Sequence, residues 1–157
     1  GAIAVARENS VALGLAERAR FAVADWTAAL RGPFDVVLAN PPYIPTQEIQ
    51  KLQPEVANFE PRLALDGGAD GLAAYRRLAA GLPEIMGHNS LVAFEVGIGQ
   101  WQDVAALMRN SGLRVAPPVA DFGGVDRCVI CHCSEGVNQK KGLEPGHEPS
   151  SFSLGPR

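Results

Sequence analysis

The sequence lacks any uninterrupted apolar run that is long enough to cross a lipid bilayer. Hydrophobic residues make up 46% of the 157 residues, but no stretch reaches the roughly 18–20 residues that a membrane-spanning helix needs. The first residues also lack the basic and then apolar pattern of a secretory signal. We therefore expect a cytoplasmic protein without membrane contact.

Cysteine is scarce, with three residues that all lie between positions 128 and 133. Such an odd, closely spaced set does not form a disulfide framework. Cys128, Cys131 and His132 do match the Cys-x-x-Cys-His pattern of c-type haem attachment. This segment has the composition of a strand, in which residues three apart face opposite sides, so we expect partly buried thiols and no metal or haem.

Positive charge is not in excess, since 14 Lys and Arg residues stand against 17 Asp and Glu residues and give a net charge of −3. A protein that binds nucleic-acid phosphates usually has a basic face, so we expect no direct binding to nucleic acid. The Gly-x-Ser-x-Gly elbow of hydrolases and the phosphate-binding loop of nucleotide hydrolases are also absent. Asp66 and Asp70 lie among glycines and are expected to form turns.

Apolar segments alternate between the periods of strands and helices. They predict strands at 21–24, 34–39, 91–96, 113–116 and 127–133, and helices near 1–19, 71–86 and 100–110. This alternation predicts an α/β fold with a doubly wound parallel sheet, in which the strand at 34–39 is buried on both faces. The link between the last two strands is too short for a crossover helix, so they should form an antiparallel hairpin.

The positions of proline and glycine indicate where loops and helix ends lie in the rest of the chain. Residues 40–70 are rich in both and predict a long, ordered loop without regular structure. Pro83 predicts a kink or an early end of its helix. Residues 134–157 are rich in Gly, Pro, Ser, Lys and Glu, which predicts a disordered tail after a folded domain at 1–133.

The segment that most clearly indicates a binding site is Asn-Pro-Pro-Tyr at 40–43, directly after an apolar strand. Ligands of open α/β sheets bind beyond the carboxyl ends of the strands. The Asn40 side chain and the Pro41 carbonyl offer two acceptors on a backbone that Pro41 and Pro42 stiffen, and Tyr43 offers a flat ring. These features suit a planar NH2 group that receives a methyl group, although a merely rigid turn is the plainer alternative.

Over residues 2–133 the chain resembles the glutamine-N5 methyltransferases of the HemK/PrmC type, which modify class I peptide chain release factors. The motif at 40–43 occurs in several nitrogen methyltransferases, and the flanking segments narrow the resemblance to this family. These segments are Ala-Arg-Glu-Asn at 6–9, Asp25-Trp26, Phe59-Glu60-Pro61 with Ala64-Leu65, Asp70-Gly71-Leu72, Phe94-Glu95-Val96-Gly97 with Gln100, and Asp121-Phe122-Gly123 with Arg127.

The resemblance implies an acceptor site at the motif. Asn40, Pro41, Pro42 and Tyr43 would bind the side-chain amide of a glutamine in the Gly-Gly-Gln loop of a release factor. Asn40, Pro41 and Tyr43 would be the catalytic residues among them. For such a transfer, positioning supplies most of the catalysis.

The resemblance also implies S-adenosyl-L-methionine as the cofactor. Asp25 and Trp26 would border its adenosine part, and Asn40 would lie beside the methyl donor. Glu60 and Glu95 would brace a loop or a strand end. No metal ligand is implied.

The implied fold is a Rossmann-like class I methyltransferase fold with the strand order 3-2-1-4-5-7-6, of which this chain holds strands 3–7. The chain lacks the Gly-rich loop after strand 1, the acidic residue after strand 2 and the N-terminal helical domain. Without strands 1 and 2, about 14 Å would separate strand 3 from strand 4. We therefore expect that residues 1–157 alone neither complete the sheet nor bind the cofactor tightly.

Two alternative functions remain. The first is methylation of adenine N6 in nucleic acid, which the acidic balance and the Phe-Glu-Pro segment at 59–61 disfavour. The second is a non-catalytic remnant or a protein-binding fragment, which the missing cofactor loop favours. The coding sequence upstream of Gly1 would distinguish the remnant from the enzyme.

Overall fold

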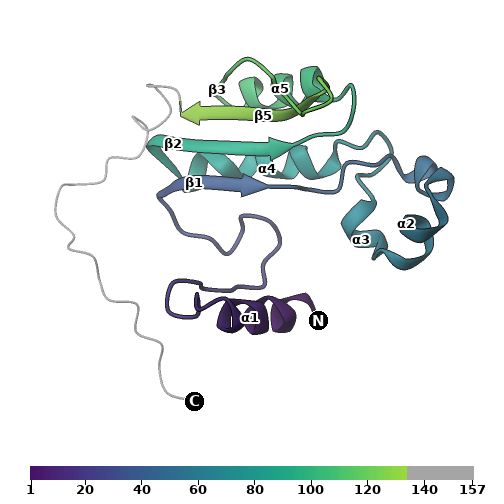
Figure 1. The fold of residues 1–157 in the computed structure, drawn as a ribbon. Coiled ribbons are helices and arrows are strands. Elements are labelled where there is room, and N and C mark those ends of the chain that lie inside the picture. Colours follow the sequence, from purple (N-terminus) through teal and green to yellow (C-terminus); the bar gives the residue numbers. More distant parts are fainter. Residues whose placement is uncertain (134–157) are drawn as a thin grey trace.

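The computed structural model describes residues 1–133, and the predicted disordered tail at 134–157 lies outside these described residues. Helices and strands alternate along the described part (Figure 1). In chain order they are α1 (Ala2–Ala12), β1 (Phe34–Ala39), η1 (Thr46–Lys51), α2 (Pro54–Phe59), α3 (Arg62–Leu65), α4 (Ala73–Ile85), β2 (Met86–Glu95), α5 (Trp101–Asn110), β3 (Leu113–Val115), β4 (Val119–Ala120) and β5 (Asp126–Cys133).

The strands form one mixed sheet in the order β1-β2-β5-β3, with β4 also paired to β5. β1 and β2 are parallel, whereas β5 is antiparallel to β2, β3 and β4. Leu113 lies opposite Cys133 and Val115 opposite Cys131, so the predicted antiparallel hairpin is confirmed. The order matches strands 4-5-7-6 of the Rossmann-like methyltransferase fold that the resemblance implies.

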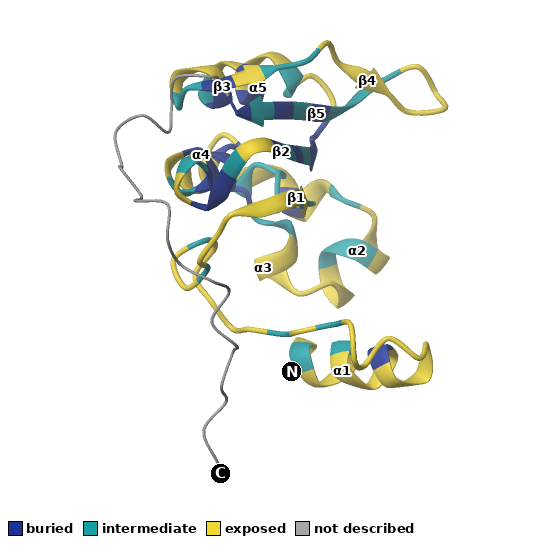
Figure 2. Cartoon of the chain, turned by 90° about the vertical axis from the view of Figure 1, so that its left-hand side faces the viewer, coloured by how far each residue is buried: buried dark blue, intermediate teal, exposed yellow. Residues whose placement is uncertain are grey.

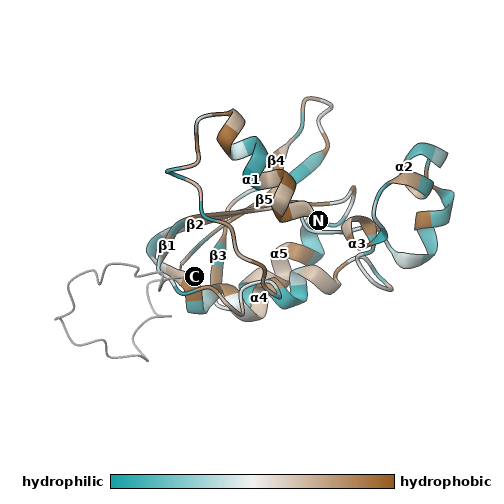
Figure 3. Ribbon diagram, turned by 90° about the horizontal axis from the view of Figure 1, so that it is seen from below, coloured by the Kyte–Doolittle hydropathy of each residue, from teal (hydrophilic) through white to brown (hydrophobic). Residues whose placement is uncertain are grey.

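The core lies between this sheet and two helices, α4 and α5, which cover one of its faces (Figure 1). Apolar residues of α4 recur at helical spacing, so that Tyr75 and Leu82 point to the sheet together. Tyr75 meets Phe94 of β2 edge to face, with ring centroids 6.2 Å apart. The central strands β2 and β5, which contain hydrophobic segments in Figure 3, contribute Val92, Phe94, Val129 and Cys131 to this core.

The opposite face of the sheet is open at β1. The prediction that this strand is buried on both faces is wrong for the described residues, because Val37 and Ala39 pack against the core while the opposite face is uncovered there. Val36 is 57% and Leu38 75% exposed, and Figure 2 shows β1 as largely exposed. No helix among residues 1–133 is placed to cover these side chains. Separately, no helix within these residues is both long enough and apolar enough to cross a bilayer.

The strand predicted at 21–24 does not form, because these residues have no partner strand and lie in irregular chain. A strand needs a neighbour for its backbone hydrogen bonds, and the sheet described here begins only at β1. The prediction that this chain holds strand 3 of the family fold is therefore wrong for the described residues. The preceding helix, α1, ends near Gly14, whose φ of +67° breaks the helical path.

The segment at 40–70 is ordered, as predicted, but it is not free of regular structure, since η1, α2 and α3 lie within it. Each of these helices is at most six residues long. Ile44 ties the segment together, because its backbone N–H donates to Leu65 and its carbonyl accepts from Gly67. The predicted early end at Pro83 is also wrong, since α4 continues through Pro83 to Ile85.

Candidate functional site

The Asn-Pro-Pro-Tyr turn (residues 40–43) leaves β1 at its carboxyl end. Ala39 pairs in parallel register with Phe94, so the next residue of each strand, Asn40 and Glu95, lies at the same edge of the sheet. The turn between β4 and β5 returns the chain to the same edge, where β5 starts with Asp126 and Arg127. Three segments that are distant in sequence therefore meet beside the turn.

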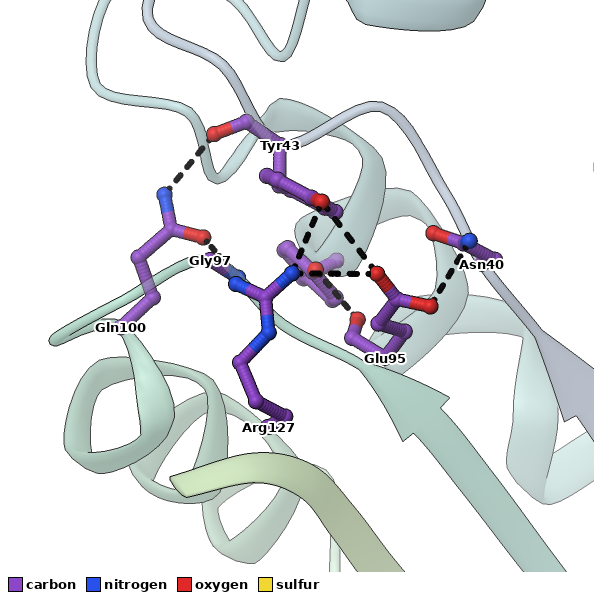
Figure 4. Close-up of polar contacts among 7 residues, drawn as sticks. Asn40, Tyr43, Glu95, Gly97, Gln100 and Arg127 are labelled. Atoms are coloured by element: carbon purple, nitrogen blue, oxygen red, sulfur yellow. Dashed lines mark hydrogen bonds and ion pairs between the residues drawn. The ribbon is translucent and has the colours of Figure 1, made fainter. Parts of the chain in front are cut away.

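Glu95 accepts hydrogen bonds from side chains of all these segments (Figure 4). Asn40 Nδ2 donates to Glu95 Oε2 over 2.9 Å, and the Tyr43 hydroxyl donates to Glu95 Oε1 over 3.2 Å. Arg127 Nη2 reaches Glu95 Oε1 at 3.2 Å and the Tyr43 hydroxyl at 3.2 Å. The expectation that Glu95 braces a strand end is confirmed, and what it braces is the turn itself.

The guanidinium of Arg127 also lies over the Tyr43 ring, 5.5 Å from its centroid. A cation at this distance is attracted to the face of an aromatic ring. Burial alone would lower the pKa of Arg127, but the hydrogen bond to Tyr43 and the nearby charge of Glu95 raise that pKa above its ordinary value. The arginine is therefore a fixed positive charge beneath the turn.

Gln100 holds the backbone of the turn (Figure 4). Its Nε2 donates to the Tyr43 carbonyl over 2.9 Å, and its Oε1 accepts from the Gly97 N–H over 3.0 Å. A Cβ at Gly97 would lie 2.6 Å from Gln100 Oε1, and one at Gly71 would lie 2.4 Å from the Tyr43 carbonyl oxygen. Gly71, with its φ of +77°, therefore has to be glycine for the turn to pack where it does, whereas a side chain at 97 would displace Gln100.

Tyr75 fixes the end of β2 from the side of the core. Its hydroxyl donates to the Glu95 carbonyl over 2.7 Å. Burial raises the pKa of Tyr75 above its ordinary value, so the hydroxyl keeps its proton as a donor. The backbone that carries Glu95 is thus held by the packed core, while the Glu95 side chain faces the turn.

A shallow depression on the open face of the sheet runs along this cluster. Leu38, Asn40, Glu95, Asp121 and Arg127 contribute to its lining. Asn40 is exposed there, whereas Pro41 is buried and Tyr43 is half-buried. Asn40 is therefore the member of the turn whose side chain a ligand can reach most directly.

Asp25 and Trp26 line a second depression, together with Pro42 of the turn and Arg77 of α4. Asp25 forms an ion pair with Arg77. Trp26 has a φ of +53° and is 36% exposed. The structure thus brings Asp25 and Trp26 to one end of the turn, while Asn40 lines the other depression.

Asp66 and Asp70 form turns, as predicted. The Asp66 carboxylate accepts from Thr46 Oγ1 over 2.6 Å and from the Gly68 N–H over 3.0 Å, and these bonds lower its pKa. The Asp70 carboxylate accepts from Arg76 and from the Leu72 N–H, which lowers its pKa to about 2. Both carboxylates are therefore ionised turn formers at neutral pH.

The cysteines of β5 divide between the two faces of the sheet, as predicted. Cys131 and Cys133 are buried on the side of α4 and α5, and Cys128 is half-buried in the first depression. No group of three His, Cys, Asp or Glu residues within 1–133 is placed to hold a metal ion. Burial raises the pKa of Cys131 to about 12, so this thiol is inert at neutral pH.

We predict that Cys131 resists alkylation in the folded chain. Because the thiolate is the reacting species, the rate with iodoacetamide at pH 8 should be at least about a hundredfold lower than in the urea-unfolded chain. Mass spectrometry of the alkylated peptides measures this ratio at Cys131. Equal rates in the two states would contradict the buried position of this thiol.

Sequence reasoning gave no role to two residues of the cluster, Gln100 and Arg127. Both belong to the segments that carry the family resemblance, but their partner, Tyr43, is 57 and 84 positions away. No periodicity connects such distant positions. The sequence offered one signal for Arg127, which is its position directly before an apolar strand segment, where a charged side chain is expected to lie at the end of the sheet.

The sequence was compared with known proteins. No protein-family model matches the chain. A release factor glutamine methyltransferase of Rhodospirillum rubrum is 51% identical over 130 residues, which are 83% of this chain and 40% of that protein. One of Caulobacter vibrioides is 49% identical over 130 residues, which are 82% of this chain and 45% of that protein. The chain therefore spans less than half the length of these curated relatives.

Among solved structures, the chain is similar to a release factor-specific protein-(glutamine-N5) methyltransferase from Alicyclobacillus acidocaldarius. Its sequence is 20% identical, and the superposition has a TM-score of 0.37 over 69% of this chain and 85% of the other.

Proposed function

In sequence the chain belongs to the release factor glutamine methyltransferases, and from this premise we propose that it carries the acceptor-binding part of such an enzyme. The proposed reaction transfers a methyl group from S-adenosyl-L-methionine to N5 of a glutamine side chain in class I peptide chain release factors. Because such a reaction would serve translation termination, we propose a cytoplasmic location. The observation that supports the proposal most strongly is the orientation of Asn40 at the end of β1.

Asn40 offers an acceptor to the substrate because its amide nitrogen is turned toward Glu95. Its Nδ2 donates to Glu95, so its Oδ1 is the end that remains for a ligand in the exposed position. The Pro41 carbonyl would be the second acceptor, on a backbone that two prolines restrict. Two acceptors bind the two hydrogens of a glutamine NH2 group, and a carboxyl or hydroxyl group offers no such pair.

Holding both hydrogens orients the nitrogen for reaction. The amide nitrogen is a weak nucleophile because its lone pair is delocalised, and a fixed geometry supplies much of the rate enhancement for such a transfer. Tyr43 would flank the planar amide with its ring. A bound cofactor would supply the electrophilic methyl group, and the proton displaced from the amide nitrogen would pass to solvent water.

The residues described here fit the cofactor only in part. Trp26 offers an aromatic ring at the second depression, but the Asp25 carboxylate beside it is engaged by Arg77. The glycines at 97 and 99 lie between β2 and α5, and no glycine is among the residues that line the second depression. These residues therefore do not form a complete site for S-adenosyl-L-methionine, and we assign no reaction step to them at that depression.

We predict that the 157-residue chain alone binds S-adenosyl-L-methionine weakly, without saturation in the micromolar range, because among residues 1–133 no glycine lines the depression beside Asp25 and Trp26. Isothermal titration calorimetry measures this affinity directly. The curated relative from Rhodospirillum rubrum, titrated in parallel, should saturate and serves as the control. Stoichiometric micromolar binding by the 157-residue chain would show that its residues suffice for the cofactor.

The proposed substrate is tested by a methyl-transfer assay. A protein that carries residues 1–133 together with a cofactor-binding segment is incubated with labelled S-adenosyl-L-methionine and either a class I release factor or double-stranded DNA. Label is expected in the release factor and not in DNA. Label in DNA would instead support methylation of adenine N6, and label in neither would support a non-catalytic role.

A further inference from the structure

We propose that Glu95 and Arg127 fix the orientation of the Asn40 side-chain amide, so that the site selects a primary amide and rejects a carboxylate of the same shape. This inference rests on the proposed function, in which Asn40 binds the acceptor group. Glu95 and Arg127, which lie outside the Asn-Pro-Pro-Tyr turn, would then determine that the site binds glutamine and not glutamate. Figure 4 shows both of them beneath the turn.

The cluster allows one arrangement of its protons. Arg127 only donates, so the Tyr43 hydroxyl must accept from it and give its own proton to Glu95. A carboxylate only accepts, so the Asn40 atom that lies 2.9 Å from Glu95 Oε2 must be the NH2 nitrogen. A flipped Asn40 amide would bring two acceptor oxygens together at that distance. The Glu95 carboxylate, which Arg127 binds from its other side, therefore keeps the Asn40 Oδ1 atom directed away from it.

This orientation decides which acceptor group can bind. Asn40 Oδ1 and the Pro41 carbonyl are both acceptors, and a glutamine amide offers two hydrogens to them. A glutamate carboxylate offers none and would place its charge against two oxygens. Sites built to pair with a hydrogen-bond donor discriminate strongly against a group that lacks it, because their own polar atoms are then left unpaired.

Arg127 acts as a positioning residue through Glu95. The side chain of Glu95 is 40% exposed and that of Arg127 is 25% exposed, so water competes for the carboxylate. The guanidinium binds Oε1 and leaves Oε2 for Asn40. It also packs on the Tyr43 ring, so its loss would free both Tyr43 and Glu95. Arg127 itself touches no reacting atom in this arrangement.

The first test follows the Asn40 side-chain NH2 signals by nuclear magnetic resonance in the 157-residue chain and needs no activity. A bond to a charged acceptor should slow solvent exchange of these protons by about tenfold relative to the exposed Asn110. Arg127→Gln and Glu95→Ala should abolish most of this protection, and Arg127→Lys should keep part of it. Arg114→Gln, which alters an exposed arginine on β3, is the matched control and should change nothing.

The second test measures selectivity with two peptides that differ only in the acceptor residue, Gly-Gly-Gln and Gly-Gly-Glu. Each is titrated into the same chain while the Asn40 and Tyr43 signals are followed. The glutamine peptide should bind at least about tenfold more tightly. Glu95→Gln should narrow this preference to within about threefold, because a glutamine at 95 can pair with either end of the Asn40 amide. The matched control is Asp103→Asn, which removes an exposed carboxylate on α5 and should leave the preference for the glutamine peptide unchanged.

The outcomes separate this inference from the proposed function. Equal affinity of the wild-type chain for both peptides would overturn the selection, while binding of the glutamine peptide would still support the acceptor site. Unchanged selectivity in Glu95→Gln, or unchanged Asn40 protection in Arg127→Gln, would also overturn it. Binding of neither peptide by a chain with a protected Asn40 would contradict the proposed function and the selection with it.

Discussion

Replacing Asn40 by alanine is expected to lower turnover by about a hundredfold or more. The variant removes the proposed acceptor for the substrate amide and leaves Glu95 with one donor fewer. Because Asn40 is exposed and lies after the last residue of β1, the fold should be retained. The measurement is the initial rate of methyl transfer to a release factor by a protein that carries residues 1–133 with a cofactor-binding segment.

Two controls separate loss of the acceptor from loss of structure. Asn110→Ala removes an exposed asparagine at the end of α5 and should leave the rate unchanged. The thermal unfolding midpoint of Asn40→Ala should stay near that of the parent, since exposed substitutions usually change stability by less than about 0.5 kcal/mol. A near-normal rate in Asn40→Ala would show that another group binds the substrate amide.

Replacing Phe94 by alanine is expected to lower the free energy of unfolding by about 3–5 kcal/mol. The Phe94 side chain has no exposed surface, and its ring meets Tyr75 edge to face. Its removal leaves a cavity between β2 and α4 and weakens the support of the Tyr75 hydroxyl that holds the Glu95 carbonyl. Since typical domains are stable by only about 5–15 kcal/mol, this variant should be largely unfolded at moderate denaturant concentrations.

Denaturant unfolding followed by circular dichroism measures this effect. The matched control is Phe122→Ala, because Phe122 lies fully exposed in the turn before β5. That substitution should change the unfolding free energy by less than about 0.5 kcal/mol. Equal losses in the two variants would contradict the placement of Phe94 in the core.

The elements that depend on local pattern were predictable from the sequence. The helical spacing of Tyr75 and Leu82 and the amphipathic segment of α5 correspond to helices in the structure. The short link between β3 and β5 was enough to predict their antiparallel pairing. The carboxyl end of an apolar strand likewise placed the Asn-Pro-Pro-Tyr turn at the edge of the sheet.

The elements that depend on distant partners were not predictable in this way. The apolar run at 21–24 has the composition of a strand, but no neighbour lies beside it within the described residues. β1 is apolar on both faces, yet one of its faces is open there. Composition reports the environment for which a segment is suited, whereas pairing and burial depend on what is present to cover it.

The candidate site likewise has one part that was predictable from the sequence and one part that was not. The turn was found from four adjacent residues whose chemistry is legible in sequence. The residues that orient it, Glu95, Gln100 and Arg127, come from three other parts of the chain. Only the parallel register of β1 and β2 and the antiparallel return of β5 bring them to the turn.

The central claim is that this chain presents a glutamine amide for methylation. Tandem mass spectrometry of a class I release factor tests it most directly, after incubation with S-adenosyl-L-methionine and a protein that carries residues 1–133 with a cofactor-binding segment. We expect one added methyl group, localised to the side-chain nitrogen of the glutamine in the Gly-Gly-Gln loop. A methyl group on another residue, or an unmodified release factor beside a demonstrably cofactor-bound enzyme, would contradict the account.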